Sequence, residues 1–239
     1  MASFFVVGAT GLTGREVLRI AREQGHRVVA HVRPDSPRKQ YWRQVFEDLG
    51  AELDTTPFED ERFGASLRAS KPDAIFGLLG TTRRRGRRAA KTGQVENYDT
   101  VDYGLTSLLL SAATRGAPDA RFVYLSAMGV SAHSHNPYLR VRHQLEAELA
   151  ESGMDYVVAR PSFILGERDE KRRGESLGAG LVDMALSGVG AFGARRTQER
   201  YRSTDAPRLG RALVSLALSP ETSRRVVLSD ELRALGGEE

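Results

Sequence analysis

The chain has no cysteine and no long apolar run, and each absence excludes a class of structure. Without cysteine, neither disulfides nor thiolate metal sites can form. Charged residues interrupt every apolar stretch, so no segment reaches the roughly 20 residues that a membrane helix needs. The first eight residues carry no basic leader, and their apolar run is too short for a signal peptide. We therefore expect a cytoplasmic protein without membrane contact.

Much of the excess positive charge of the chain lies in one short run. The 239 residues carry a net charge of +4, and 40% of them are hydrophobic, which is a globular composition. Five arginines lie in the run 83–88. No aromatic residue lies within the run to stack on bases, which disfavours nucleic-acid binding. We interpret the run as a solvated loop, with an anionic substrate or cofactor phosphates as the alternative ligand.

Short apolar runs alternate with longer amphipathic ones along the whole chain. Strands are predicted at residues 3–7, 27–32, 51–55, 74–79, 121–125, 156–159 and 226–228. Helices are predicted at residues 12–23, 39–49, 97–114, 138–151, 177–186 and 205–218. Near-continuous apolar strands separated by helices predict an α/β fold of the doubly wound (Rossmann) type, with a mostly parallel sheet and helices on both faces. We expect one domain over 1–239, with a small substrate-side portion at about 162–204.

A glycine-rich turn, Gly-Ala-Thr-Gly-Leu-Thr-Gly, joins the first strand to the first helix. Gly8 allows a tight turn, Gly11 allows close approach of a pyrophosphate to the backbone, and Gly14 allows the helix to pack on the strand. The helix N-terminus then offers free N–H groups and a partial positive charge to phosphates. The residues predicted to bind the dinucleotide here are Gly8, Thr10, Gly11, Leu12, Thr13 and Gly14.

The GxxGxxG spacing resembles that of the extended and atypical short-chain dehydrogenases/reductases, which include nucleoside-diphosphate-sugar epimerase-like proteins. The resemblance covers most of the chain and implies a Rossmann domain that binds NAD or NADP. The segment Tyr-Leu-Arg-Val-Arg-His at 138–143 and an Arg-Pro segment at 160–161 are similar to those of the NmrA-like and Tat-interacting-protein-type branch. The resemblance places this Arg-Pro segment and the segment 77–82 at the cofactor. The residues expected to bind it from these two segments are Leu79, Gly80, Thr81 and Pro161.

The end of the second predicted strand favours NADP over NAD. NAD-binding folds usually place an acid there, to bond the ribose hydroxyls, whereas this chain has Arg33. A guanidinium at this point can pair with the 2′-phosphate of NADP. The neighbouring Asp35 could instead meet a ribose, and Arg33 could be a solvated surface residue.

Ser126 ends a predicted strand, Tyr138 opens a helix twelve residues later, and Arg142 follows one turn further on the same face. This resembles the Ser…Tyr-x-x-x-Lys arrangement of the family. The resemblance implies that Tyr138 exchanges the substrate proton and that Ser126 holds the substrate oxygen. The family lysine, which bonds the nicotinamide ribose and lowers the pKa of the tyrosine, is replaced by Arg142. The resemblance therefore implies that Tyr138 and Arg142 also bind the cofactor. A second departure is Asp102, where the family often has Asn.

The combined reading is an NADP-dependent oxidoreductase that acts on a carbonyl or alcohol of a small molecule. Ser126 and Tyr138 favour an enzyme. Arg142 and Asp102 favour the alternative, a non-catalytic NADP-binding sensor of the NmrA-like type with a protein partner. His133 and His135 lack the further ligands that a metal site needs, so no metal is expected. The sequence leaves the oligomeric state open.

Overall fold

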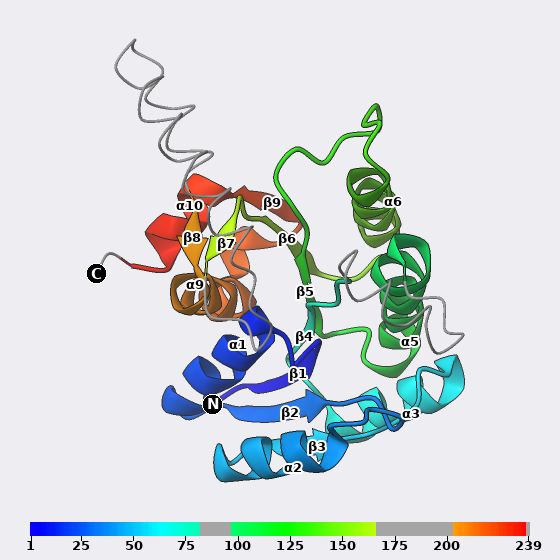
Figure 1. Cartoon of the computed structure of the whole chain (residues 1–239), viewed down its shortest axis with the longest axis vertical. Coiled ribbons are helices and arrows are strands. Elements are labelled where there is room, and N and C mark those ends of the chain that lie inside the picture. Colours follow the sequence, from blue (N-terminus) through cyan, green and yellow to red (C-terminus); the bar gives the residue numbers. More distant parts are fainter. Residues whose placement is uncertain (82–96, 166–202, 238–239) are drawn as a thin grey trace.

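A computed structural model describes residues 1–81, 97–165 and 203–237, and its centre is a parallel sheet of seven strands (Figure 1). The strands of this sheet are β1 (Ser3–Val7), β2 (Arg27–His31), β3 (Glu52–Asp54), β4 (Ala74–Gly77), β5 (Arg121–Leu125), β6 (Tyr156–Arg160) and β9 (Arg225–Leu228). Their order is β3-β2-β1-β4-β5-β6-β9, and every neighbouring pair is parallel. The predicted doubly wound fold is confirmed.

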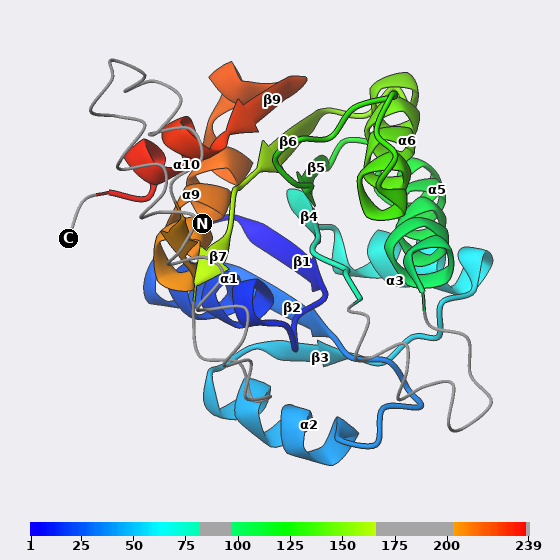
Figure 2. The same ribbon diagram turned by 45° about the horizontal axis from the view of Figure 1, so that its top comes forward.

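Helices cover both faces of the sheet. The helical elements are α1 (Leu12–Glu23), α2 (Lys39–Asp48), α3 (Asp60–Ser70), the π-helix η1 (Tyr98–Leu105), α5 (Thr106–Gly116), α6 (Pro137–Glu151), α9 (Ala206–Leu218), the 3₁₀-helix η2 (Pro220–Thr222) and α10 (Ser229–Leu235). Helices α1, α2 and α9 lie on one face, and α3, α5 and α6 lie on the other (Figures 1 and 2). None of the helices within 1–81, 97–165 and 203–237 is long and apolar enough to cross a membrane.

Successive side chains of β1 point alternately into two separate hydrophobic cores, one on each face of the sheet. Phe4 and Val6 point into the core beneath α1, α2 and α9, whereas Phe5 and Val7 point into the core beneath α3, α5 and α6. All four are completely buried. A strand that is buried on both faces must be apolar throughout, which explains why the sequence predicted β1 to the residue.

The structure departs from the predicted elements where local signals are weak. Helix α3 was not predicted, because its buried surface comes mainly from Phe63 and Leu67 and no side chain caps its N-terminus. The helix predicted at 97–114 is divided into η1 and α5. The helix predicted at 177–186 lies outside the described residues. So does most of the portion at 162–204, whose ends form the two-stranded sheet of β7 (Ile164–Leu165) and β8 (Thr204–Asp205).

The strand order places the topological switch point of the sheet beside β1. From β1 the chain moves outward to β2 and β3, and it then returns to the other side of β1 as β4. Loops at the carboxyl ends of β1 and β4 therefore diverge, and such a switch point is where doubly wound sheets bind ligands. The glycine turn follows β1, and the segment from Leu79 to Thr81 follows β4.

Candidate functional site

Two glycines of the turn after β1 are required by the fold itself. Gly8 has a φ of +90°, and a Cβ there would lie 2.6 Å from the carbonyl oxygen of Leu78 in the loop after β4. A Cβ on Gly14 would overlap the carbonyl oxygen of Gly8. Any side chain at either position would force the backbone apart, so these glycines let β1, β4 and α1 approach one another.

Gly11 differs, because the space beside it is largely open. Among the described residues, a Cβ there would meet only the Gly8 carbonyl oxygen, at 3.1 Å, and Gly11 is exposed. Gly11 is the N-cap of α1, has an extended conformation, and supplies no side chain to the first-turn amides. The first turn of α1 also carries no acid. Free amides and open space at a helix N-terminus suit a phosphate.

Three arginines lie around the β2–α2 connection. Arg33 follows β2, and its Nε is 3.7 Å from an Asp35 carboxylate oxygen. The guanidinium carbon of Arg38, the N-cap residue of α2, lies 5.1 Å from the centre of the Trp42 ring, and that of Arg15 lies 5.9 Å from it. Of these three arginines, only Arg33 was predicted from the sequence. The single tryptophan of the chain, Trp42, could have indicated Arg15 and Arg38, because basic residues often stack on an aromatic ring.

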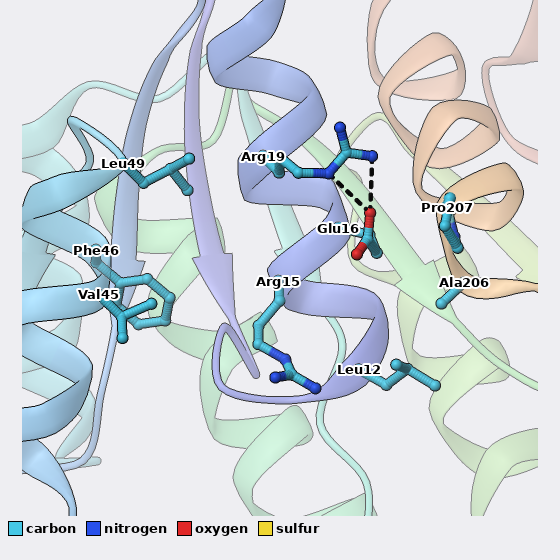
Figure 3. Close-up of a pocket in the computed structure, with 9 residues that line it drawn as sticks. All are labelled: Leu12, Arg15, Glu16, Arg19, Val45, Phe46, Leu49, Ala206 and Pro207. Atoms are coloured by element: carbon cyan, nitrogen blue, oxygen red, sulfur yellow. Dashed lines mark hydrogen bonds and ion pairs between the residues drawn. The ribbon is translucent and has the colours of Figure 1, made fainter. Parts of the chain in front are cut away.

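A groove of about 500 Å³ runs along α1 between α2 and α9 (Figure 3). It is lined by Leu12, Arg15, Glu16, Arg19, Val45, Phe46, Leu49, Ala206 and Pro207. Its polar side chains include Glu16, which accepts hydrogen bonds from Arg19. The groove reaches the glycine turn through Leu12 and Arg15, but it contains none of the catalytic candidates.

Helix α6 presents three polar side chains, Tyr138, Arg142 and Glu146, at four-residue steps. The helix begins where the sequence favours it: the side chain of Asn136 accepts a hydrogen bond from the Tyr138 amide, and Pro137 occupies the first helical position. Tyr138 is half-buried, and the Arg142 guanidinium lies 5.1 Å from its ring centre. The Tyr98 ring lies 5.3 Å away on η1. Tyr138 and Arg142 are therefore brought together.

Arg142 is almost completely enclosed, with 4% of the residue exposed. Its Nη1 donates to the Tyr124 hydroxyl at 3.1 Å and to the Leu125 carbonyl at 2.5 Å. Its Nη2 donates to the Leu79 carbonyl at 3.1 Å and to Asp102 Oδ1 at 2.7 Å. Arg142 is thus anchored to protein atoms of β5, the loop after β4, and η1.

The charge of Arg142 is secured by its surroundings. Burial alone would lower the pKa of Arg142, but Tyr124, Tyr138 and Asp102 raise it above its ordinary value. Burial has the opposite effect on Tyr124, whose pKa it raises. Arg142 is consequently a permanent cation beside the ring of Tyr138, although the carboxylate of Asp102 offsets part of its field.

Ser126 directly follows β5, and its hydrogen-bond partner is Glu146, a residue that was not predicted from the sequence. Its hydroxyl, on a residue that is 4% exposed, donates to Glu146 Oε1 at 2.5 Å. Glu146 also accepts a hydrogen bond from Arg160 Nε at 3.0 Å. A serine hydroxyl has one proton, so Ser126 in this arrangement can accept a hydrogen bond from another group but cannot donate one. In the described part of the chain, no hydrogen bond joins Ser126 to Tyr138.

The remaining predicted residues border the same edge of the sheet. The Thr81 amide donates to Asp102 Oδ2 at 2.9 Å, and a Cβ on Gly80 would lie 3.2 Å from Arg142 Nη2. The Pro161 carbonyl accepts a hydrogen bond from the Met128 amide. The arginine run 83–88 lies outside the described residues.

Residues 8–185 match a family model described as NAD(P)H-binding. The chain belongs to this family. The matched span begins at the first glycine of the turn and includes the loops that follow β1 and β4. It gives the cofactor class as NAD or NADP, without choosing between them.

Relatives of this NAD(P)H-binding protein are named mitochondrial. The protein FMP52 of Eremothecium gossypii is 31% identical over 235 residues, which cover 96% of this chain and 95% of the relative. The protein FMP52 of Candida albicans is 28% identical over 176 residues, which cover 70% and 69%. The expectation of a cytoplasmic protein is therefore wrong: these relatives point to the mitochondrion. Composition alone missed it, because the absence of cysteine does not define a compartment.

Solved structures agree with the fold of the family. A putative NAD-dependent epimerase/dehydratase from Bacillus halodurans superimposes with a TM-score of 0.66 at 20% identity, covering 99% of each chain. The enzyme WbmH of Bordetella bronchiseptica, solved in complex with NAD+, gives 0.60 at 16% identity, covering 96% of this chain and 76% of that one. At these identities the likeness concerns the fold.

Proposed function

We propose that the protein is an NADP-dependent oxidoreductase that interconverts a carbonyl and an alcohol of a small-molecule substrate. The observation that carries this proposal is the position of Tyr138. Its ring is half-buried, lies against the permanently charged Arg142, and stands at the edge of the sheet where the glycine turn opens. A tyrosine beside a fixed cation is suited to exchange a proton.

The residues around the glycine turn fit a dinucleotide phosphate. The open space beside Gly11 and the uncapped first turn of α1 form a cradle that a side chain would fill. NADP rather than NAD is supported by Arg33 at the end of β2, with Arg15 and Arg38 close to Trp42. Guanidinium groups pair well with phosphate oxygens. When bound, the nicotinamide supplies or accepts the hydride.

A side chain of the protein must supply the proton that the reduced substrate needs. A carbonyl that gains a hydride becomes an alkoxide, which then needs a proton from a nearby acid. In our proposal the Tyr138 hydroxyl donates this proton, and Arg142 stabilises the resulting tyrosinate electrostatically. Ser126 would orient the substrate oxygen only after its proton turns away from Glu146.

The proposal is tested by replacing the tyrosine hydroxyl. NADPH oxidation is followed with a panel of aldehydes and ketones, and NADP+ reduction with alcohols. Tyr138→Phe should lower turnover by about 10²–10⁴-fold, the usual contribution of general acid–base catalysis, while the Kd for NADPH stays nearly unchanged. Tyr103→Phe is the matched control, since that hydroxyl bonds Glu148 on the flank of α6. Equal turnover for the Tyr138 variant and the wild type would refute the proposed role.

A second candidate function is a non-catalytic NADP sensor. Two hydrogen-bonded pairs favour it: Asp102 offsets the charge of Arg142, and the Ser126 hydroxyl donates its hydrogen bond to Glu146. A sensor needs the dinucleotide but no proton transfer. NADPH binding without turnover on any substrate of the panel, together with a protein contact that changes when NADPH binds, would favour the sensor over the enzyme.

A further inference from the structure

Asp102 is the most enclosed charged residue of the described site, with 0% of its surface exposed. It lies on η1, whose first turn is fixed by a reciprocal pair of hydrogen bonds between Asn97 and Thr100. One carboxylate oxygen accepts from Arg142 Nη2 at 2.7 Å, and the other accepts from the Thr81 backbone amide at 2.9 Å. Each oxygen therefore binds a different segment of the chain.

The pair of Asp102 and Arg142 fastens the segment after β4 at two points. Asp102 holds the N–H of Thr81, and Arg142 holds the carbonyl oxygen of Leu79. The same guanidinium also holds the Leu125 carbonyl at the end of β5. The backbone from 79 to 81, which follows β4 at the switch point beside β1, is thus tied to η1, β5 and α6 through one buried ion pair.

Stability alone does not account for a pair of this kind. Two buried charges lose their hydration, and apolar side chains of similar volume often stabilise a protein as well or better. The directed hydrogen bonds are what apolar side chains could not supply. Both bonds to the segment after β4 end on backbone atoms, so they fix its conformation whatever its side chains are.

We infer that Asp102 is a positioning residue: together with Arg142 it holds the backbone from Leu79 to Thr81 in the conformation that accepts the dinucleotide. The inference rests on the proposed cofactor site. It also assigns Arg142 a role that differs from direct cofactor binding, because both of its terminal nitrogens already donate to protein atoms. The opposite charges of Asp102 and Arg142 therefore act as one unit.

The test uses Asp102→Asn in the full chain, with two readouts. Hydrogen exchange of the peptide that ends at Thr81 reports the anchoring without any nucleotide. Calorimetry with NADPH, at a temperature where the variant is folded, reports affinity. We expect faster exchange at the Thr81 amide and a Kd raised by about tenfold or more, the loss expected when a hydrogen bond to a charged group is weakened.

Asp155→Asn is the matched control. Asp155 also pairs with a buried arginine, since it accepts from Arg121 Nε at 2.8 Å, but this pair lies at the amino-terminal ends of the strands. The control should lower the melting temperature without changing Thr81 exchange or the Kd. If Asp102→Asn behaves as this control does, the positioning role is refuted.

A second variant covers failure of Asp102→Asn to fold. Asp102→Leu combined with Arg142→Met leaves no unmatched buried charge. Faster Thr81 exchange in this folded variant supports the anchoring role, and wild-type protection overturns it. If the wild type binds neither NADPH nor NADH, the proposed function fails, whereas the exchange measurement still decides whether Asp102 anchors the segment. Faster exchange with an unchanged Kd would refute the link to the dinucleotide.

Discussion

Replacement of Gly11 by valine should separate dinucleotide binding from folding. The valine side chain would enter the open space beside the first turn of α1. Among the described residues, its Cβ would contact only the Gly8 carbonyl oxygen, at 3.1 Å. Gly11 already has the extended backbone conformation, with φ of −75° and ψ of 166°, which valine adopts readily. The remaining penalty is the loss of a favourable N-cap residue, about 0.5–1 kcal/mol.

This penalty corresponds to a fall in melting temperature of about 1–4 °C for a chain of this length. Dinucleotide affinity should be lost, because the side chain fills the volume that the pyrophosphate needs. Gly14→Ala is the contrasting variant: its methyl group would overlap the Gly8 carbonyl, so it should destabilise the fold by about 1–3 kcal/mol or more. Calorimetry and thermal denaturation measure both quantities. A Gly11→Val variant that binds NADPH with wild-type affinity would refute the pyrophosphate assignment.

Two further substitutions address the cofactor and the serine. Arg33→Ala should weaken NADPH binding by about 1.5–3 kcal/mol, the worth of a charge-assisted hydrogen bond, and leave NADH binding nearly unchanged; equal losses for the two cofactors, measured by calorimetry, would contradict selection of the 2′-phosphate. Ser126→Ala should lower the free energy of unfolding by about 1.5–3 kcal/mol, because the buried carboxylate of Glu146 loses a donor. Denaturant unfolding that shows wild-type stability would contradict this hydrogen bond.

The part of the site that is local in sequence was predictable. The run from Ser3 to Glu23 contains a strand, a glycine turn and a helix whose bounds match the prediction to the residue. Each of the three elements is specified by neighbouring residues: an apolar run, glycines at fixed spacing, and a helical apolar face. The spacing between Tyr138 and Arg142 was likewise sufficient to place both on one face of α6.

The interactions that join distant segments were not predictable in the same way. From the sequence, Asp102 and Arg142 were two separate departures from a family pattern. They are 40 residues apart, yet their side chains meet at 2.7 Å. Each departure compensates the other, which only the path of η1 beside α6 reveals. Glu146, 20 residues beyond Ser126, was missed for the same reason.

The polar residues Tyr138, Arg142 and Glu146 lie in one row on α6 and differ in their contacts. Arg142 and Glu146 are each bound to an oppositely charged side chain, and these pairs fasten the helix to its surroundings. Tyr138 stands at the open end of the same row. In the proposed mechanism its hydroxyl is the group of this row that exchanges the proton, the charge of Arg142 stabilises the product of that exchange, and the carboxylate of Asp102 offsets part of this charge. An enzyme must turn over a substrate of the panel and lose that turnover in Tyr138→Phe, whereas a sensor must bind NADPH without turnover, so these two measurements decide between the functions.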